Sequence, residues 1–393
     1  MTFPTAIALP TIPALLQSSA GAVTHGMRDE IKRWLGHLGW SQMALWPWLG
    51  AAENSASVNE RLSIGSPRNG GPTPPEMSPS PEDGLPFYHE PVLLQQVIDY
   101  LRPSPGAWFF DATLGGGGHT EALLQGGANV VAMDQDPVAI AHATSRLRAH
   151  AGRFSVLRGN FRHFEEVLGE IGIRQFDGIL ADIGVSSKQL DDVSKGFSFM
   201  HDGPLDLRMD PDGPQTAADL VNTLAEEDLM RMFFEYGEEP KARRIARGIV
   251  QARAVKSIRT TLQLAQIVEK ASPRTGKRHP ATLVFQALRI AVNDELGALE
   301  DFLKVAPKWL KPGGRLAIIS FHSLEDRIVK HTFQKYAMAE LDRPEWPAPR
   351  PNPDFCLRLL TRKPVEATPE ELQANPRARS ARLRVAEHIS RPS

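Results

Sequence analysis

The sequence predicts an α/β fold in which helices cover a parallel sheet, with an all-helical insertion inside it and a disordered extension before it. Three observations lead to this prediction. Short apolar runs alternate with segments of helical periodicity between residues 92 and 183, a pattern typical of parallel sheets. About a hundred residues of purely helical periodicity follow. The first 83 residues differ in composition from everything after them.

Length and composition limit the class of protein. At 393 residues, 41% hydrophobic and 23% charged, the chain can bury a sizeable core as one large domain with additions or as two domains. No stretch approaches the roughly 18 consecutive apolar residues that a membrane span needs. The single cysteine, Cys356, excludes an intramolecular disulfide and a multi-cysteine zinc site. Because one cysteine fits a reducing compartment, we expect a cytoplasmic protein that has no contact with a membrane.

Residues 1–83 are expected to form a low-complexity, disordered extension. Met1 to Gly26 carry no charged residue and are interrupted by prolines, so they lack the basic start and unbroken apolar core of a secretory signal. Residues 29–46 could form a short helix, whereas residues 63–85 are rich in Pro, Gly and Ser, as linkers are. Two interpretations stay open for the extension: a docking segment, or an over-called translation start.

The elements of the sheet follow in order from residue 92. Helical periodicity is found at 92–101, 121–124 and 137–150. The apolar runs that predict strands are Trp108–Asp111, Val130–Asp134, Phe154–Leu157 and Gly178–Ile183. Because helical segments separate the strands, these units imply a parallel sheet covered by helices.

The alternation then stops for the all-helical insertion. Helical periodicity is found at 217–221, 226–236, 241–254 and 261–271. Strand signals resume only at Arg315–Ser320. We therefore expect a Rossmann-like domain made of residues 84–193 and 290–393, with residues 194–289 as an inserted helical domain that recognises the substrate.

Basic residues are unevenly distributed, although the formal net charge is only -1. Between Lys241 and Arg278 there are eleven Lys or Arg and one acid, Glu269. A second basic group lies near the C-terminus, at Arg377, Arg379, Arg382 and Arg384. Such groups suit a polyanion such as nucleic acid, and a solvated helix face is the alternative interpretation.

A glycine-rich turn after the first strand is the first sign of chemistry. The segment 111–119 reads DATLGGGGH, and Asp134 ends the next strand nineteen residues after Gly115. A glycine turn lets a ligand approach the backbone, and an acid at this spacing can accept hydrogen bonds from ribose hydroxyls. Thr120 stands where a dinucleotide fingerprint needs its third glycine, so the loop better matches the D/E-x-x-x-G-x-G loop of methyltransferases. We therefore expect S-adenosyl-L-methionine as cofactor. His119 either contacts it or only shapes the turn.

A carboxylate at the end of the fourth strand is the candidate catalytic group. Asp182 lies in LADIGVSS at 180–187, where open α/β sheets bind their ligands. An acceptor fixed on the exocyclic amine of cytosine can turn the conjugated lone pair toward the methyl donor. Asp182 could also bind the amino group of the cofactor, or cap the turn. The D/N/S-P-P-Y/F motif of DNA amino-methyltransferases does not follow this strand.

Five segments, in order, resemble a known family. They read DATLGGGGH (111–119), LADIGVSSKQLDDVSKGFSFMHDGPLDLRMDPDG (180–213), RHPATLVFQALRIAVNDEL (278–296), KPGGRLAIISFHSLEDRIVK (311–330) and NPRARSARLRVAE (375–387). Together they are similar to the bacterial ribosomal RNA small subunit methyltransferase H family, over about three quarters of the chain. The chain departs from the family pattern at Leu283, where Arg is usual, and at Ala181, where Leu is usual. Residues 1–83 have no family counterpart.

The resemblance implies a class I methyltransferase sheet with an inserted helical domain and closing strands near Leu357–Leu360 and Arg382–Ala386. It implies that the protein methylates N4 of one cytidine, cytidine 1402, in the decoding region of 16S rRNA, with S-adenosyl-L-methionine as donor. The residues that it implies for the cofactor are Gly117, Gly118, His119, Asp134, Phe161, Asp182 and Gln189.

Four residues are candidates for substrate binding, each with a structural alternative. Phe197 and Phe199 alternate as on an extended segment, so one could stack on a flipped base, or both could be core. Arg208 lies between two acids, which favours an internal ion pair over a phosphate contact. His322 follows the fifth strand and either has a structural role or positions the substrate. Water can take the proton that the methylated amine loses, so no dedicated base is required.

The resemblance implies 16S rRNA as partner, and two separated basic groups favour an assembled or nearly assembled small subunit. A second copy of the chain is a further candidate partner. No metal site is expected, because His279 and His322 are lone histidines. The main alternative is a non-catalytic RNA-binding assembly factor that retains a cofactor pocket. An NAD-dependent dehydrogenase is disfavoured by the missing third glycine.

Overall fold

The computed structural model describes residues 91–170, 172–173, 175–274, 276, 279–342 and 344–390, which belong to one compact unit. The predictions made for residues 1–83, including the helix at 29–46, lie outside the described residues, as does the linker prediction at 63–85.

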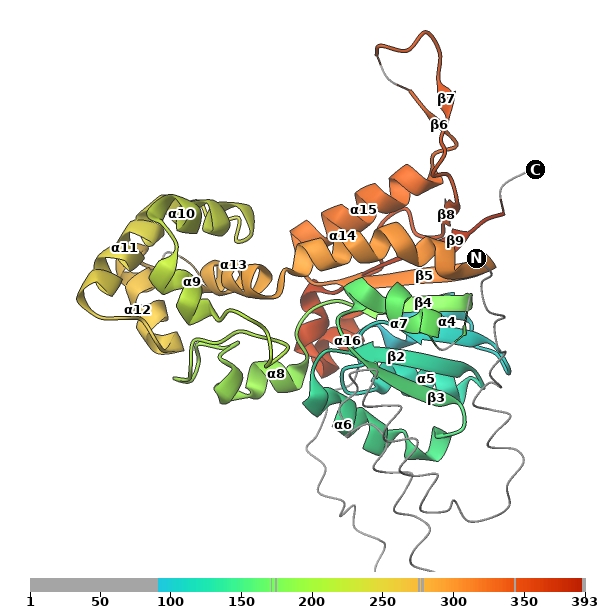
Figure 1. Cartoon of the computed structure of the whole chain (residues 1–393), viewed down its shortest axis with the longest axis horizontal. Coiled ribbons are helices and arrows are strands. Elements are labelled where there is room, and N and C mark those ends of the chain that lie inside the picture. The colour runs from blue at the N-terminus through green and yellow to red at the C-terminus, as the bar shows by residue number, and fades with distance from the viewer. Residues whose placement is uncertain are drawn as a thin grey trace, which may run out of the picture. The chain divides into compact units, whose positions relative to one another are not determined.

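A seven-stranded sheet forms the centre of this unit (Figure 1). Its strands are β1 (Trp108–Asp111), β2 (Asn129–Asp134), β3 (Phe154–Arg158), β4 (Phe176–Asp182), β5 (Leu310–Ser320), β8 (Leu357–Leu359) and β9 (Arg382–His388). They lie in the order β3-β2-β1-β4-β5-β9-β8. The first five are parallel, whereas β9 runs antiparallel to both β5 and β8. The expected Rossmann-like sheet is confirmed.

Helices cover both faces of the sheet because both faces are apolar. In β1, for example, Phe109 packs into one hydrophobic cluster and Phe110 into another, as the alternation of side chains along a strand requires. The helices that share a cluster with Phe109 are α4 (Leu94–Leu101), α5 (Gly118–Gln125) and α6 (Pro137–Arg146). Those that share a cluster with Phe110 are α7 (Phe164–Glu170), α14 (Glu295–Val305) and α15 (Ser323–Ala337).

The segment between β4 and β5 is helical, as expected, and has a hydrophobic cluster of its own (Figure 1). Its helices are α9 (Ala217–Thr223), α10 (Glu226–Glu235), α11 (Ala242–Val255), α12 (Thr261–Ala271) and α13 (Ala281–Asn293), and the short α8 (Ser187–Asp191) precedes them. The expected division at residues 289 and 290 falls inside α13. The break between α13 and α14 is at Asp294, whose φ is 46°. None of the described helices has the length and apolar character that a bilayer crossing needs.

Smaller elements complete the described part of the chain. The strands β6 (Glu340–Leu341) and β7 (Arg350–Pro351) form a separate hairpin, and α16 (Pro369–Ala374) lies between β8 and β9. Among the expected strands, β5 differs most, because it begins at Leu310 instead of Arg315. Leu310 pairs with Phe176, and pairing resumes at Arg315 after an irregularity. The four residues between them, KPGG, resemble a turn in the sequence.

Gly117 sets the start of α5 and yields a test of the turn. Its φ is 80°, and an added Cβ would lie 3.2 Å from side-chain atoms of Ala143 and Leu147 in and after α6. We expect Gly117→Ala to lower the free energy of unfolding by about 1–2 kcal/mol, because L residues are strained at this φ. Urea unfolding measures it. Gly169→Ala is the matched control, since Gly169 lies in α7 with open space around it, and it should not destabilise. Equal losses in the two variants would contradict the explanation.

Candidate active site

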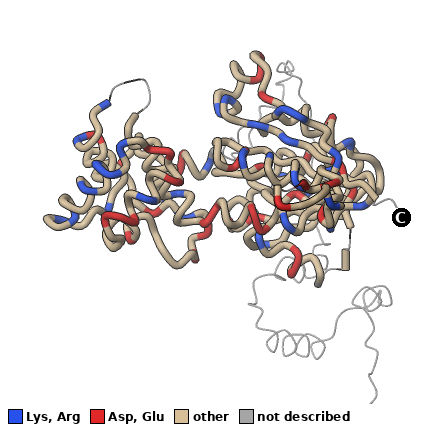
Figure 2. The backbone as a smooth tube through the Cα atoms, turned by 90° about the horizontal axis from the view of Figure 1, so that it is seen from above, with Lys and Arg blue, Asp and Glu red and all other residues tan. Residues whose placement is uncertain are grey.

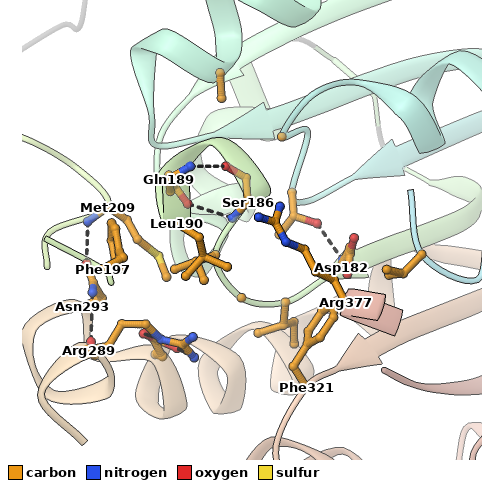
Figure 3. Close-up of a pocket in the computed structure, with 18 of the residues that line it drawn as sticks. Asp182, Ser186, Gln189, Leu190, Phe197, Met209, Arg289, Asn293, Phe321 and Arg377 are labelled. Carbon is orange, nitrogen blue, oxygen red and sulfur yellow. Dashed lines mark hydrogen bonds and ion pairs between the residues drawn. The ribbon is translucent and has the colours of Figure 1, made fainter. Parts of the chain in front are cut away.

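A cavity of about 710 Å³ lies at the carboxyl ends of β1, β2, β4 and β5 and extends to α13 (Figure 3). Parallel strands bring their carboxyl ends to one edge of the sheet, which is where such folds bind ligands. Most of the residues predicted for the site line this cavity: Gly118, His119, Asp134, Phe161, Asp182, Gln189, Phe197, Phe199 and His322. Gly117 and Arg208 do not line it.

Asp134 holds the glycine-rich loop at one end of the cavity. One carboxylate oxygen accepts the N–H of Gly115 at 2.8 Å and the other accepts the N–H of Asp136 at 2.9 Å. Burial raises the pKa of Asp134, against these two hydrogen bonds. Gly115 and Gly116 expose main chain to the cavity. Nearby, the ring of Phe161 packs edge-on against Phe302 at 5.3 Å and supplies an apolar wall. A carboxylate beside bare backbone and an aromatic wall suits an adenosine.

Asp182 is positioned by the loop that follows β1. Its N–H donates to Oγ1 of Thr113 at 2.7 Å. One carboxylate oxygen, Oδ2, lies 3.8 Å from Nδ1 of His119. The other, Oδ1, is buried and has no hydrogen-bond partner among the described residues. Since a buried acceptor without a donor is costly, Asp182 is prepared to accept an N–H from a ligand.

His119 presents a lone pair to Asp182. Its Nε2 lies 3.0 Å from the carbonyl oxygen of Val92, which can only accept, so Nε2 carries the proton. Burial lowers the pKa of His119 to about 4, and the imidazole is therefore neutral. Burial also raises the pKa of Asp182 to about 8, helped by the negative charges of Asp111 and Glu325. Among the described residues, no Lys or Arg pairs with the Asp182 carboxylate.

Asp111, at the end of β1, holds the glycine-rich turn through two hydrogen bonds. Its carboxylate accepts the hydroxyl of Thr120 at 2.6 Å and the N–H of Thr113 at 3.1 Å. The side chain is fully buried, and burial raises its pKa to about 6 in spite of these bonds. Asp111 does not line the cavity, so it has a structural role.

Gln189 is engaged in a capping box at the start of α8. Its side-chain oxygen accepts the N–H of Ser186 at 2.9 Å, and Oγ of Ser186 accepts the N–H of Gln189 at 3.2 Å. Its amide nitrogen donates to Asp136 at 3.0 Å, which also pairs with Lys195. Gln189 thus ties β2, α8 and the start of the helical segment together at the cavity wall. The S-x-x-Q spacing is a capping signal that the sequence contains.

The two phenylalanines pack into the helical core and also line the cavity. Phe197 is 7% exposed and belongs to the hydrophobic cluster of the helical segment. Phe199 packs against that cluster, with its ring centroid 5.0 Å from that of Phe285 and 4.8 Å from that of His279. The two interpretations of these residues are therefore compatible, because each ring is anchored on one side and faces the cavity on the other.

Arg208 forms an internal ion pair, as its position between two acids predicts. Its Nε and Nη2 donate to the two carboxylate oxygens of Asp206 at 2.7 and 2.9 Å, and Nη1 donates to the carbonyl of Gly213 at 2.8 Å. With the guanidinium occupied and outside the cavity lining, the structure gives Arg208 the structural role.

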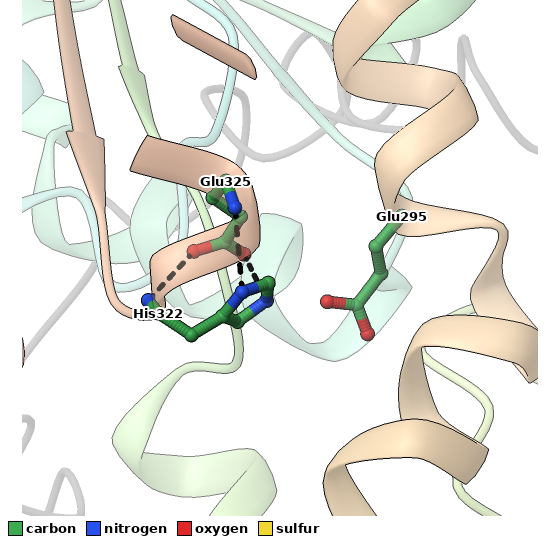
Figure 4. Close-up of side chains that lie close together, drawn as sticks. All are labelled: Glu295, His322 and Glu325. Carbon is green, nitrogen blue, oxygen red and sulfur yellow. Dashed lines mark hydrogen bonds and ion pairs between the residues drawn. The ribbon is translucent and has the colours of Figure 1, made fainter. Parts of the chain in front are cut away.

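A buried ionic cluster, which the sequence did not reveal, borders the cavity (Figure 4). Arg289 donates to both carboxylate oxygens of Glu295 at 2.8 Å. His322 begins α15, and its Nε2 lies 3.0 Å from Oε1 of Glu325, whose other oxygen accepts the N–H of Phe321. Burial alone would raise the pKa of Glu325, but His322 and Arg289 outweigh it and lower that pKa. The H-x-x-E spacing, a capping box with His at the cap, is the signal that could have revealed Glu325.

Glu295, His322 and Glu325 also offer three ligand atoms within 4.8 Å of one another. Arg289 already covers both oxygens of Glu295. Arg289 pairs with Glu295 and His322 with Glu325, so the polar atoms of the cluster contact one another without requiring a metal ion.

The structure divides the basic group near the C-terminus, which the sequence indicates as a candidate for contact with a polyanion. Arg384 is buried and donates to both oxygens of Asp326 at 2.7 and 3.1 Å, and Arg382 contacts the same carboxylate at 3.5 Å. These two arginines therefore attach β9 to α15. Only Arg377 and Arg379 line the cavity.

The basic group of the helical segment is largely on the surface. Among the described residues of this group, several are exposed and make no ion pair: Lys241, Arg243, Arg244, Lys256, Arg259 and Lys270. Figure 2 shows basic positions recurring along this part of the chain. They remain available for an anionic partner.

The order of the strands defines the class of protein. In a dinucleotide-binding Rossmann sheet the sixth strand is parallel to the others, whereas here the antiparallel β9 lies between β5 and β8, as in class I methyltransferases. The glycine loop, the acid at the end of β2 and the carboxyl group at the end of β4 surround one cavity. The protein is a methyltransferase of this class, and its cofactor is S-adenosylmethionine.

Comparison with known proteins gives the family. The model of the MraW methylase family matches residues 86–389, and the chain belongs to this family. A protein of Carboxydothermus hydrogenoformans named ribosomal RNA small subunit methyltransferase H is 48% identical over 307 residues, which cover 77% of this chain and 99% of that protein. A protein of the same name from Anaeromyxobacter sp. (strain K) is 49% identical over 306 residues, 77% of this chain and 98% of that protein.

Similar solved structures include a putative rRNA methylase from Clostridium thermocellum. It has a TM-score of 0.36 and 13% identity, and the match covers 78% of this chain and all of that one. A putative methyltransferase from Streptococcus mutans in complex with SAH has a TM-score of 0.35 and 12% identity, over 75% of this chain and 97% of that one.

The raised pKa of Asp182 predicts a pH-dependent cost to stability. The unfolded chain loses the proton of this carboxyl group near its ordinary pKa of 3.8, whereas the folded chain keeps it up to about pH 8. Stability therefore falls as pH rises through this window. We expect Asp182→Asn to raise the thermal midpoint by a margin that widens from pH 4 to pH 8. Asp99→Asn, at an exposed site in α4, is the control. A margin independent of pH would contradict the prediction.

Proposed function

We propose that the protein methylates N4 of a specific cytidine, cytidine 1402, in the decoding region of 16S rRNA. The observation that carries the proposal is the buried, unpartnered Oδ1 of Asp182 at the carboxyl end of β4, on the wall of the cofactor cavity. The relatives named ribosomal RNA small subunit methyltransferase H support an rRNA substrate, since each is matched over nearly its whole length.

The cofactor would be held at the end of the cavity where Asp134 lies. The residues proposed to hold it are Gly117, Gly118, His119, Asp134, Phe161, Asp182 and Gln189. In this arrangement Asp134 accepts from the ribose, Phe161 packs against the adenine and the loop supplies main-chain contacts. Gly117 acts indirectly, because it shapes the turn without lining the cavity. When bound, S-adenosylmethionine supplies an electrophilic methyl group on a sulfonium sulfur.

Asp182 is the proposed catalytic residue. The lone pair on N4 of cytosine is conjugated with the ring, which makes the amine a poor nucleophile. Without a ligand, burial raises the pKa of Asp182 to about 8, and the positive sulfonium of the bound cofactor would favour the ionised form. By accepting one N4–H, this carboxylate would hold the amine so that its lone pair points out of the ring plane. The methyl group would pass from the sulfonium sulfur to N4, and the amine would release its proton to Asp182 or to water.

The opposite wall of the cavity would receive the target base. Phe197 and Phe199 present aromatic rings that are anchored in the helical core, and such rings stack on flipped bases. His322 would position the base from the start of α15. We propose residues 194–289 as the substrate-recognition domain, with its exposed cations on rRNA phosphates. Recognition of structured RNA favours an assembled small subunit in the cytoplasm as substrate. A homodimer is a further prediction, which light scattering tests.

The first experiment incubates the protein with labelled S-adenosylmethionine and small subunits from cells that lack this activity. Mass spectrometry of the digested rRNA is expected to show N4-methylcytidine at a single position. A different methylated nucleoside would rule out the proposed substrate while leaving a methyltransferase. Cofactor binding without any transfer would favour the alternative of a non-catalytic assembly factor.

Asp182→Ala tests the catalytic role in the same assay. We expect transfer to fall by about 100-fold or more, since positioning and proton acceptance by one side chain typically contribute 10²–10⁴. Asp99→Ala, which removes an exposed carboxylate in α4, should keep full transfer. Full transfer by Asp182→Ala would refute the proposed mechanism.

Metal removal tests the ion network around Arg289. We expect the purified protein to contain no stoichiometric metal by elemental analysis, because Arg289 already occupies both oxygens of Glu295. Transfer by protein dialysed against a chelator should match that of untreated protein within about twofold. Loss of transfer that one transition metal restores would identify Glu295, His322 and Glu325 as ligands.

A further inference from the structure

Two arginines lie on one short turn at the rim of the cavity. The 3-10 turn Pro376–Ser380 joins α16 to β9, and Pro376, Arg377, Arg379 and Ser380 all line the cavity. Figure 3 shows Arg377 and Asp182 among the side chains around it. None of the roles proposed above uses this turn.

The guanidinium of Arg377 has a protein partner for one of its two terminal nitrogens. Its Nη2 donates to both carboxylate oxygens of Asp191 in α8, at 2.9 and 3.1 Å. Its Nη1 is buried and has no hydrogen-bond partner in the described part of the chain. A guanidinium is planar and donates along two edges, so Asp191 fixes its orientation and leaves a second set of donors without an acceptor. Buried donors in native proteins are almost always paired, which indicates that a ligand supplies the acceptor.

Arg379 adds a second charge two residues further along. It is exposed, lines the cavity and makes no ion pair within the described ranges. The next two arginines differ, because Asp326 pairs with both Arg382 and Arg384. The structure thus separates two arginines that stabilise the fold from two that face the cavity.

The ligand that fits this pair is an oxyanion. Arginine binds carboxylate and phosphate oxygens through charge-assisted, often bidentate hydrogen bonds. Two oxyanions could reach the cavity of such an enzyme: a phosphate of the RNA strand and the carboxylate of the cofactor. Arg379 is exposed at the rim, where a strand outside the cavity would pass, and Arg377 is only partly exposed, with its Nη1 buried. This placement favours the phosphate.

We propose that Arg377 and Arg379 clamp a backbone phosphate next to the target nucleotide and so position its base over Asp182. The proposal rests on the proposed function in that the substrate is RNA. Both arginines are positioning residues, because a phosphate contact fixes register and orientation without reading the base. Since Asp191 holds Arg377, the clamp is connected through α8 to the segment that follows Asp182.

The experiment measures binding of small subunits from cells that lack the activity, over a range of salt, for the full chain and its variants. Arg377→Gln and Arg379→Gln should each weaken binding by about tenfold and reduce the slope of log affinity against log salt by about 1. Arg362→Gln is the matched control, because Arg362 is exposed, makes no described ion pair and does not line the cavity. Thermal midpoints verify folding.

Two further measurements separate a clamp from a structural role and from cofactor binding. Asp191→Asn removes the ion pair but keeps the Arg377 charge, so subunit affinity should be retained; a loss equal to that of Arg377→Gln would overturn the proposal. S-adenosylhomocysteine affinity, measured by calorimetry, should be unchanged in both arginine variants. A fall in that affinity with normal subunit binding would assign the oxyanion to the cofactor carboxylate and overturn the phosphate clamp.

Unchanged subunit binding and an unchanged salt slope in both arginine variants would also overturn the proposal. Failure of the clamp can be distinguished from failure of the proposed reaction. If the wild-type protein formed no N4-methylcytidine while the arginine variants still lost subunit affinity, the reaction would be rejected and the clamp would stand.

Discussion

The site depends on one buried carboxylate that does not line the cavity. Asp111 ends β1 and accepts hydrogen bonds from Thr113 and Thr120 on either side of the glycine-rich turn. Thr113 in turn accepts the N–H of Asp182 from β4, and Gly115 donates to Asp134 at the end of β2. Three neighbouring strands are thus connected through a single loop. The positions of the Asp134 and Asp182 carboxyl groups follow from this one set of bonds.

The second constraint is that the helical segment is tied to the sheet by polar contacts. Asp136 beside β2 binds Gln189 and Lys195, and Arg158 of β3 pairs with Asp210 and Asp212. These contacts place aromatic rings of the helical core opposite the carboxyl ends of the strands. The cavity therefore combines polar groups at the ends of the strands with aromatic rings from the helical segment.

Periodicity and spacing predicted the parts of this arrangement that are local in sequence. The strand Trp108–Asp111 and the helix Thr261–Ala271 have the expected bounds, and the end of β4 placed Asp182 at the sheet edge. Pairings between distant residues could not be predicted, because nothing in a single sequence links Arg384 to Asp326 or Arg377 to Asp191. For the same reason the environment of His322 could not be predicted, because Arg289 and Glu295 approach it from α13 and α14.

The helical segment also affects how the chain is assembled. Strand β5 begins about 130 residues after β4 ends, yet the two lie side by side in the sheet. At a synthesis rate of 5–20 residues per second, β4 waits roughly 6 to 26 seconds for its neighbour to be made. The contacts among helices α9 to α13 mostly join segments that are close in sequence, so these helices can pack during this interval. Ile179 and Ala181 of β4 are thus buried late, once β5 and the helices that cover it have been made. Until then the apolar edge of β4 is open to other chains.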